Sequence, residues 1–515
     1  MKKKFTKFLT LALAGILSCA TLGGCVSEEA HPTLPDYSAS GKQFTFFCYG
    51  NLSNGKYTIT DSNGNETIVD YGNHRTVEKY KEYKDCGFDL IMAGDYDLRY
   101  QVWEESDAKD ILDKAYEAGI TKGIITDVEM RRMTESFDKL IGEGEDYMFQ
   151  NEAQLLERVK ECIKVYKDHP AFYGINLRDE PTWQSHTSFA YVYKAIRQAE
   201  KELGMDEIYL HMNQLPLGAT GATQYAPEGM FENLGDAFTY YVEEWLKGTG
   251  ANRISCDVYA FRGSGITSAY FNTVQTYRKM CDKYGADLTF CLQSIESWSG
   301  QNQQFRDIDK ADMYYEIFSL IGMGVDNFTY YTYMPPGGYS AVGNMYTDSG
   351  SFLTRAGEKT NIWYWGQQVI ADAQKFAPVA LSYDCIGSKF YLNDIVNHNN
   401  APYMSTSGGS YTPMLYDNSH EHKLLKSIEM DNDVVFTTEM YDKENDLYMY
   451  MLQNAIDPAA GENGRTEMNV TATFDSAYTW VAEYDCGNLT YVKLDNGVYK
   501  NLLSAGQSVF LIPLK

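Results

Sequence analysis

The sequence predicts an α/β protein, a (β/α)8 TIM barrel followed by a small antiparallel β-sandwich. From Phe44 to about Tyr333, eight short apolar runs alternate with longer amphipathic segments. Strands that alternate with helices indicate βαβ units and a parallel sheet, and eight such units fit a closed barrel better than an open doubly wound sheet. No glycine-rich phosphate loop follows the first run, which disfavours a dinucleotide-binding fold.

The eight runs expected to be barrel strands are FTFFCY, FDLIMAG, GIITDV, FYGINL, EIYLHMN, NRISCDVY, DLTFCLQS and VDNFTYYTY. Helix-like segments such as SDAKDILDKAYEAG separate them, and Gly87, Gly119 and Gly324 stand where a helix would end. From about Ile428 the pattern changes to short alternating runs separated by turns, which is typical of a β-sandwich. We therefore expect a barrel over 41–375, a connecting segment over 376–427 and the sandwich over 428–515.

The N-terminus has the pattern of an export signal. A lysine-rich start precedes an apolar stretch from Phe8 to Leu17, which is too short to cross a bilayer. Leu22-Gly23-Gly24-Cys25 resembles the bacterial lipobox, which implies that residues 1–24 are removed and that Cys25 carries a lipid. The resemblance implies a membrane-anchored, extracytoplasmic protein of the bacterial cell envelope, with residues 25–40 as a linker.

Composition argues against several classes of function. The formal charge of −26 would repel nucleic acid, and no basic stripe with interleaved aromatic residues is present, so we expect no DNA or RNA partner. The cysteines outside the leader region are scattered and lie mostly in apolar runs, which indicates small buried thiols. His420-Glu421-His422 lies in a polar stretch, and we expect neither a metal there nor any cofactor.

Strand parity indicates which side chains enter the barrel. In YGINLRDEP, the apolar Ile175 and Leu177 share the face that packs on helices, so Asn176, Arg178 and Glu180 are expected on the inner face. Asp179 is expected to point the other way, and Pro181 ends the strand. Glu180 would then be the last inward residue at the carboxyl end of the strand, where active sites of this fold lie.

The same parity places polar and aromatic side chains at the ends of four later strands. A polar cup with aromatic residues near its rim suits a carbohydrate. The residues expected to bind it are Arg178, Asn213, Asp257, Tyr259, Gln293, Trp298 and Tyr331.

Three motifs carry a family resemblance. HPAFYGINLRDEP, ISCDVYAF and GVDNFTYYTY resemble the (β/α)8 glycoside hydrolases of the retaining clan, most closely family 42 β-galactosidase-type catalytic domains. The closing GVYKNLLSAGQSVFLIPL is similar to the β-domain that ends many such chains. The resemblance implies that Glu180 is the general acid/base and that a glutamate after the seventh strand is the nucleophile, for which Glu296 is the only carboxylate near that strand end.

Two departures from the pattern of the clan leave the identity of the second catalytic carboxylate open. The clan usually has asparagine where this chain has Asp179, and Glu296 lies three residues past Gln293, outside the inward parity of the strand. Asp257 is the alternative, and a wider separation of Glu180 and Asp257 would leave room for a water molecule and favour inversion.

The leading hypothesis is therefore a membrane-anchored glycoside hydrolase that cleaves oligo- or polysaccharides by a two-carboxylate, retaining mechanism. A barrel that binds glycans without hydrolysing them is the second. The binding lipoprotein of an ABC importer is the third, although such proteins have two α/β lobes and no terminal sandwich.

Overall fold

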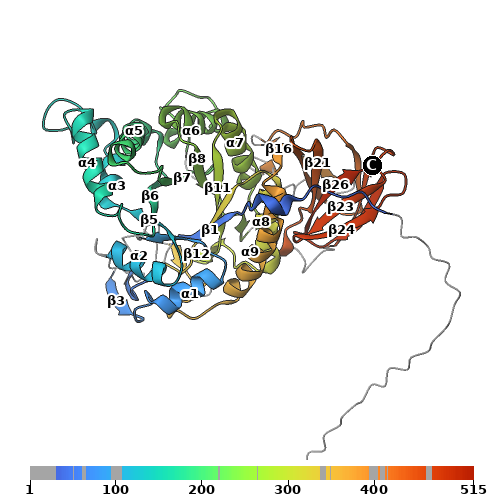
Figure 1. Cartoon of the computed structure of the whole chain (residues 1–515), viewed down its shortest axis with the longest axis horizontal. Coiled ribbons are helices and arrows are strands. Elements are labelled where there is room, and N and C mark those ends of the chain that lie inside the picture. Colours follow the sequence, from blue (N-terminus) through green and yellow to red (C-terminus); the bar gives the residue numbers. More distant parts are fainter. Residues whose placement is uncertain are drawn as a thin grey trace, which may run out of the picture.

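The protein consists of a barrel and a β-sandwich that lie side by side, with the last barrel helices between them (Figure 1). The computed structural model describes residues 30–49, 52–60, 65–93, 107–218, 221–263, 265–336, 344–347, 350–393, 404–405, 412–413, 416–459 and 467–515. The expected signal sequence, the lipid-bearing Cys25 and the start of the linker lie outside these residues. Among the helices of the described residues, none is both long and apolar enough to cross a membrane.

The predicted (β/α)8 barrel is confirmed. Eight parallel strands form one sheet in the order β1-β14-β11-β8-β7-β6-β5-β4, and the two ends of that order, β1 and β4, are in contact, which closes the barrel. Each strand coincides with one of the eight predicted runs. Their bounds are β1 Thr45–Cys48, β4 Leu90–Ala93, β5 Lys122–Thr126, β6 Phe172–Asp179, β7 Tyr209–Gln214, β8 Arg253–Asp257, β11 Asp287–Gln293 and β14 Asn327–Tyr331.

Helices surround the barrel, and most of them turn an apolar stripe toward it. In α4, Leu155, Val159 and Cys162 recur at helical spacing and are buried against the sheet layer. Gly87, Gly119 and Gly324 follow α1, α2 and α8 with φ of 113°, 87° and 77°, which confirms their expected place at helix ends. The helices are α1 Val77–Asp85, α2 Asp107–Glu117, α3 Val128–Thr134, α4 Glu152–Lys164, α5 His186–Leu203, α6 Leu234–Thr249, α7 Ala269–Tyr284, α8 Lys310–Gly322 and α9 Asn361–Ala380.

Short elements decorate the barrel. A five-stranded sheet in the order β10-β9-β13-β12-β15 lies beyond the carboxyl ends of the barrel strands, and β2 pairs with β3 in a separate hairpin. Their bounds, with those of the 3-10 turns, are β2 Lys56–Thr60, β3 Glu66–Asp70, β9 Phe261–Arg262, β10 Gly265–Ile266, β12 Ser297–Ser299, β13 Asn302–Phe305, β15 Asn344–Tyr346, η1 Tyr37–Ser40, η2 Phe137–Lys139, η3 Trp183–Ser185 and η4 Ala222–Gln224.

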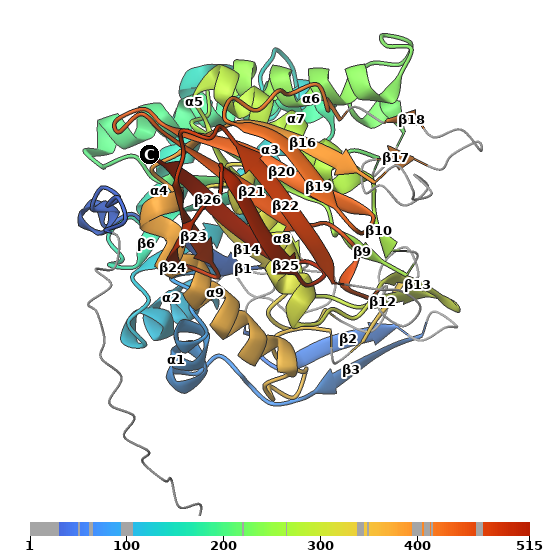
Figure 2. The ribbon, with the colours of Figure 1, turned by 90° about the vertical axis from the view of Figure 1, so that its right-hand side faces the viewer.

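The predicted sandwich is confirmed as two antiparallel sheets. The larger has the order β16-β20-β21-β26-β23-β24 and the smaller β19-β22-β25 (Figure 2). Side chains such as Tyr450, Phe474 and Leu511 form a second core between them. The strands are β16 Asp384–Leu392, β19 Leu425–Met430, β20 Val434–Asp442, β21 Leu447–Asn454, β22 Met468–Phe474, β23 Trp480–Asp485, β24 Asn488–Lys493, β25 Val498–Leu503 and β26 Ser508–Leu514, with a separate pair, β17 Met404–Ser405 and β18 Thr412–Pro413.

The segment over 376–427 was expected to connect the two parts after a final helix over 361–379, and it contains a strand that the sequence pattern did not indicate. Helix α9 continues to Ala380, and β16 pairs with β20 from Asp384 to Leu392, interrupted by one irregularity between Cys385 and Gly387. Strand β16 is therefore an integral edge of the larger sheet. Its alternation is weak because Gly387 and Ser388 interrupt the apolar residues at its centre.

The barrel and the sandwich share one hydrophobic core. Phe271 of α7 packs on Phe390 of β16 and Phe436 of β20, with ring centroids 4.9 and 4.7 Å apart. Phe376 of α9 packs on Phe510 of β26 at 4.6 Å. Because these contacts are buried and aromatic, we expect the two parts to behave as one body.

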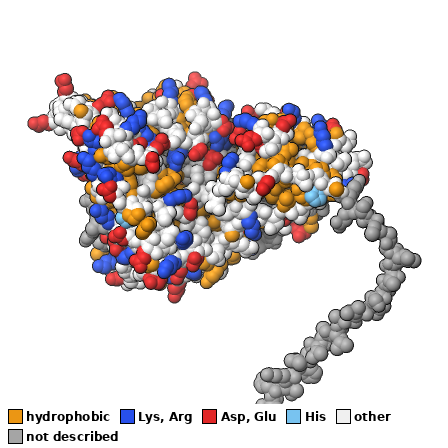
Figure 3. All heavy atoms as spheres, viewed as in Figure 1, with side chains coloured by type: hydrophobic (Ala, Val, Ile, Leu, Met, Phe, Trp, Pro, Cys, Tyr) orange, Lys and Arg blue, Asp and Glu red, His pale blue; other side chains and the backbone are white. Residues whose placement is uncertain are grey.

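Charge and cysteine placement follow the composition. On the face shown in Figure 3, acidic and basic side chains are interspersed over the barrel helices, and no single charge covers it.

All eight cysteines of the described residues are free thiols. Six of them are buried, as the apolar context predicted: Cys48, Cys86, Cys162, Cys256, Cys281 and Cys291.

Candidate active site

A cleft of about 360 Å³ opens at the carboxyl ends of β6, β7 and β8. This is the end of a (β/α)8 barrel at which ligands bind. Glu180 and Asp257 both line it, as do the aromatic residues Tyr259 and Phe305. The remaining lining residues are Pro216, Leu217, Gly218, Val258, Arg262, Thr267, Ser268 and Ala269.

A β-bulge in β6 changes which side chains enter the barrel. Asn176 pairs with His211 and Arg178 with Met212, so Leu177 has no partner on β7. The extra residue reverses the parity of everything that follows it. Asp179 therefore faces inward, where its Oδ1 accepts a hydrogen bond of 3.0 Å from Asn213 Nδ2.

Arg178 consequently points away from the lumen. Its Nη1 donates to Ser185 Oγ at 2.9 Å, and its Nε lies 4.0 Å from Glu135 Oε1. The expected inward position of Arg178 and outward position of Asp179 are thus wrong, because period-two parity does not survive a bulge. Arg178 tethers the turn after β6 to the neighbouring α3 and η3, and its placement does not support a role in substrate binding.

Glu180 still reaches the cleft, by a different route from the one predicted. Its φ of 45° lies in the left-handed region, which is uncommon for a residue other than glycine. Its backbone N–H donates to the Asn213 carbonyl at 2.8 Å, and Tyr241 Oη donates to the Pro181 carbonyl at 2.5 Å. These bonds hold the sharp turn that presents the Glu180 side chain to the cleft. Backbone strain of this kind concentrates at functional sites.

The two cleft carboxyls have different proton affinities. The Glu180 side chain is open to the cleft but enclosed on its other sides by protein. That enclosure, followed by the negative charges of Asp257 and Asp179, raises the pKa of Glu180 well above its ordinary value. Burial raises the pKa of Asp257 to about 6, opposed by hydrogen bonding from the Tyr259 and Asn213 side chains. These pKa directions favour the proton on Glu180 and the negative charge on Asp257.

Asp257 carries one buried carboxylate oxygen that accepts no hydrogen bond among the described residues. The residue is 6 % exposed, and the oxygen is its Oδ1. Asn213, which stands between the two acids on β7, is fixed by a 3.1 Å bond from Ser255 Oγ to its Oδ1. A buried carboxylate oxygen without a donor is costly unless a ligand or a reacting atom uses it.

Aromatic side chains form one wall of the cleft. Tyr259 stacks on Tyr331 with ring centroids 5.9 Å apart and meets Phe305 edge to face at 5.1 Å. The Arg262 guanidinium lies 4.3 Å over the Phe305 ring. Of the predicted tyrosines, Tyr259 lines the cleft and Tyr331 stacks on Tyr259 without being among the lining residues, whereas Arg262 and Phe305 were missed. They come from β9 and β13, short strands beyond the barrel for which the sequence offers no periodic signal.

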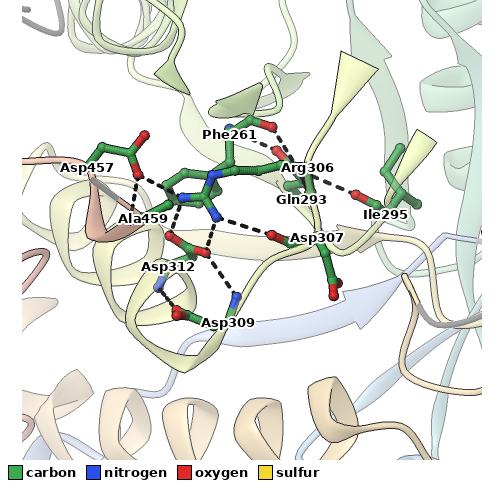
Figure 4. A network of polar contacts seen from close by, with 9 residues as sticks. All are labelled: Phe261, Gln293, Ile295, Arg306, Asp307, Asp309, Asp312, Asp457 and Ala459. Atoms are coloured by element: carbon green, nitrogen blue, oxygen red, sulfur yellow. Dashed lines mark hydrogen bonds and ion pairs between the residues drawn. The ribbon is translucent and has the colours of Figure 1, made fainter. Parts of the chain in front are cut away.

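The side chain of Gln293, which was predicted to bind the ligand, instead forms hydrogen bonds with backbone groups. Its Oε1 accepts from Phe261 N at 2.9 Å, and its Nε2 lies within 3.0–3.4 Å of the carbonyls of Phe261, Ile295 and Arg306 (Figure 4). In the same network Arg306 forms a two-pronged ion pair with Asp312 and a 2.8 Å bond to Asp457. Gln293 thus fixes the loops that carry Phe261 and Arg306.

Glu296, expected to be the second catalytic carboxylate, is held elsewhere. It accepts hydrogen bonds from Trp298 Nε1 at 2.9 Å, Gln303 Nε2 at 2.9 Å and Thr347 Oγ1 at 2.8 Å. These partners belong to the β12, β13 and β15 region, and neither Glu296 nor Trp298 is among the residues that line the cleft. Asp257, the alternative that the sequence left open, lines the cleft together with Glu180, whereas Glu296 is not among the lining residues.

The lumen beneath the cleft is closed and largely apolar. Phe47, Leu90, Met92, Ile124 and Cys291 form a separate inner core. His211 lies within it, 2.6 Å from Tyr49 Oη, and burial lowers the pKa of His211 to about 3. A neutral, buried histidine in this position supports the floor of the cleft.

Comparison with known proteins returns only distant structural similarity. No protein-family model matches, and no curated protein matches the sequence. A family 27 β-L-arabinopyranosidase from Geobacillus stearothermophilus is similar over 93% of this chain and 98% of its own, at 8% identity and a TM-score of 0.46. A family 5 glycoside hydrolase from Bacteroides vulgatus is similar over 90% and 94% of the two chains, at 12% identity and a TM-score of 0.41. At TM-scores below 0.5 such likeness is loose, and the activity has to be argued from the residues of the cleft.

Proposed function

We propose that the protein is a glycoside hydrolase in which Glu180 is the general acid/base and Asp257 the second carboxylate. The observation that carries the proposal is the pairing of these two acids in one cleft with separated proton affinities. Glycosidic bond cleavage needs one protonated and one ionised carboxyl group. The cleft supplies both in the same pH range.

Each residue has a defined task in the proposed reaction. Glu180 donates its proton to the glycosidic oxygen as the bond to the leaving sugar breaks. Asp257 attacks the anomeric carbon with a carboxylate oxygen and forms a glycosyl ester. Water, deprotonated by Glu180, then hydrolyses the ester and restores both groups. The retaining outcome follows the family 42-like resemblance, with Asp257 in place of the expected glutamate.

The walls of the cleft suit a carbohydrate. Tyr259 and Phe305 offer aromatic surface to the apolar faces of a sugar ring, and Arg262 adds N–H donors for its hydroxyl groups. The cleft volume of about 360 Å³ is enough for one or two sugar rings. We propose an oligo- or polysaccharide as the substrate class.

The place of action is proposed from the leader region alone. The lipobox-like Leu22-Gly23-Gly24-Cys25 supports export and lipid attachment at Cys25, on the outer side of a bacterial membrane. Cys25→Ala should move the protein from the membrane fraction to the soluble fraction. Retention of the variant in the membrane fraction would reject the anchor.

Turnover of a panel of aryl glycosides tests the activity. Wild type should release the aryl group, whereas Glu180→Gln and Asp257→Asn should each lose at least 100-fold in kcat/KM with unchanged circular dichroism. NMR of the first-formed anomer should show retention, and inversion would reassign Asp257 as the base that activates water. Sugar binding without turnover across the panel would favour the alternative of a glycan-binding barrel.

A further inference from the structure

We propose that His420, His422 and Glu439 form a binding site for one divalent transition-metal ion of the zinc class. One nitrogen or oxygen atom from each residue lies within 4.8 Å of the other two. Two imidazoles and a carboxylate are a ligand set that zinc uses in proteins. The site lies in the sandwich, with Glu439 on β20 and the two histidines on the segment before β19. It is separate from the Glu180 cleft and does not depend on the proposed hydrolase activity.

The tautomer of His422 is fixed by its neighbour. Thr437 Oγ1 donates its only proton to the Lys389 carbonyl at 2.9 Å. The 2.7 Å contact between Thr437 Oγ1 and His422 Nε2 therefore requires the imidazole to be the donor. The proton of neutral His422 is thus on Nε2, and Nδ1 carries a lone pair. A hydrogen bond of this type orients many metal-binding histidines.

The Nδ1 lone pair of His422 faces a carboxylate. The imidazole side chain is 0 % exposed, and Nδ1 has no hydrogen-bond partner among the described residues. Glu439 Oε2 lies 3.9 Å away, which is too far for a hydrogen bond to a protonated Nδ1. A buried lone pair opposite a carboxylate oxygen leaves room for a cation between them.

Glu439 is held in the orientation that a ligand needs. Its Oε1 accepts from Tyr450 Oη at 2.5 Å and from Lys423 N at 2.7 Å. Its Oε2 faces the two histidines and lies 2.8 Å from His420 Nε2. The His420 contact alone could be an ordinary hydrogen bond. The unpartnered Nδ1 of His422, aimed at the same oxygen, is the observation that points to a metal.

The backbone makes room for His420. Strand β16 has a register irregularity between Cys385 and Gly387, and a Cβ on Gly387 would lie 2.2 Å from His420 Nδ1. His420 is 24 % exposed at the side chain and lines a cleft of about 480 Å³ between α7 and β16. Three protein ligands with an accessible fourth side describe an open zinc site, in which water or another ligand completes the coordination.

The sequence expectation of no metal rested on the two histidines alone. The third ligand, Glu439, comes from a strand 17 residues further on, and only the folding of β20 against the preceding segment brings it to them. A tetrahedral ion with bonds of about 2.0–2.1 Å spaces its ligands by about 3.4 Å. Small rotations of the imidazoles bring the three atoms to that spacing.

Metal binding by the full-length protein tests the proposal. After chelator treatment and dialysis, calorimetry with Zn²⁺ should show one ion per chain, and Zn²⁺ should raise Tm. His420→Ala and His422→Ala should each weaken binding at least tenfold. Thr437→Val, which removes only the orienting hydroxyl, should weaken it by about 10- to 100-fold. His169→Ala, at a histidine that pairs with Asp113 on the barrel surface, is the matched control and should bind as wild type does.

The spectrum of the cobalt-loaded wild-type protein decides the matter if a histidine variant does not fold. Intense visible bands, typical of low-coordinate Co²⁺, would support the site. A spectrum like that of the free aqua ion would overturn it. Equal zinc affinity of wild type and the folded His420→Ala/His422→Ala variant, or no binding by wild type, would overturn it as well.

Discussion

Glu180 and Asp257 stand at the ends of β6 and β8, with Asn213 of β7 between them, and burial, followed by the charge of Asp257, raises the pKa of Glu180. Asn213 contacts both sides of this arrangement. Its backbone carbonyl accepts a hydrogen bond from the Glu180 N–H and so fixes that turn. Its side-chain amide donates to the neighbouring Asp179. Three adjacent strands thus place Glu180 and Asp257 near each other. Substitutions of these residues should affect catalytic activity and folding stability in different ways.

The two candidate second carboxylates should behave differently when neutralised. Glu296→Gln keeps an acceptor for Trp298 and Gln303 and turns its amide N–H₂ toward the Thr347 hydroxyl, which can accept, so we expect kcat/KM within tenfold of wild type. Asp257→Asn removes the charge in the cleft and should lose at least 100-fold. Steady-state kinetics on the same aryl glycoside compare them directly. The opposite ranking would restore Glu296 as the nucleophile.

Activity should follow the proton affinities of the pair. Asp257 must be ionised, so kcat/KM should rise as pH increases through about 6. It should fall again at higher pH, where Glu180, whose pKa is raised, loses the proton that the leaving group needs. A pH–rate profile from 4 to 9 measures both limbs. A profile that is flat through pH 6 would exclude Asp257 as the essential base or nucleophile.

Arg262 should shift the acidic limb of that profile. Its positive charge favours the ionised form of Asp257 and so lowers the pKa of that carboxyl relative to a cleft without it. Arg262→Gln should therefore move the acidic limb to higher pH, whereas Arg262→Lys should leave it nearly in place. The two profiles, measured side by side, form the test. Identical limbs in Arg262→Gln and wild type would show that the guanidinium does not act on Asp257.

The buried charge of Asp257 should lower the free energy of unfolding of the protein. Burial raises the pKa of Asp257 in the folded state to about 6, above the ordinary aspartate pKa of about 3.9. Stability is therefore lost as pH rises between these values and stays lost above them. Asp257→Asn should raise the free energy of unfolding at pH 7.5 by on the order of 2–3 kcal/mol, with little gain below pH 4. Urea unfolding at both pH values gives the difference, and a destabilised variant at pH 7.5 would contradict it.

Loss of the shared aromatic core should unfold the barrel and the sandwich together. Phe271→Ala removes the ring between α7 and strands β16 and β20 and should cost about 3–5 kcal/mol. Tyr364→Ala on α9, where the side chain is 56 % exposed, is the control and should change stability by less than about 0.5 kcal/mol. Calorimetry should show a single transition in wild type. Two well-separated transitions would show that the sandwich unfolds independently.

Much of the fold was predictable because its signals are local. The eight barrel strands match eight apolar runs, and helix ends coincide with Gly87, Gly119 and Gly324, since periodicity and backbone preference act over a few residues. The placement of Glu180 at the end of β6 was predictable in the same way. The late sandwich strands were visible because alternation persists from about Ile428 to the end of the chain.

The sequence by itself determined the architecture and the position of the first carboxylate, whereas the tertiary structure decided which other carboxyl group lines the same cleft. One unpaired residue, Leu177, reverses Arg178 and Asp179, and no periodic pattern reports a bulge. Arg262 and Phe305 reach the cleft from short strands beyond the barrel, and Glu439 reaches His422 across the sandwich. Such groups meet only when sheets close and pack, because distances between strands are set by hydrogen-bond register and not by separation along the chain.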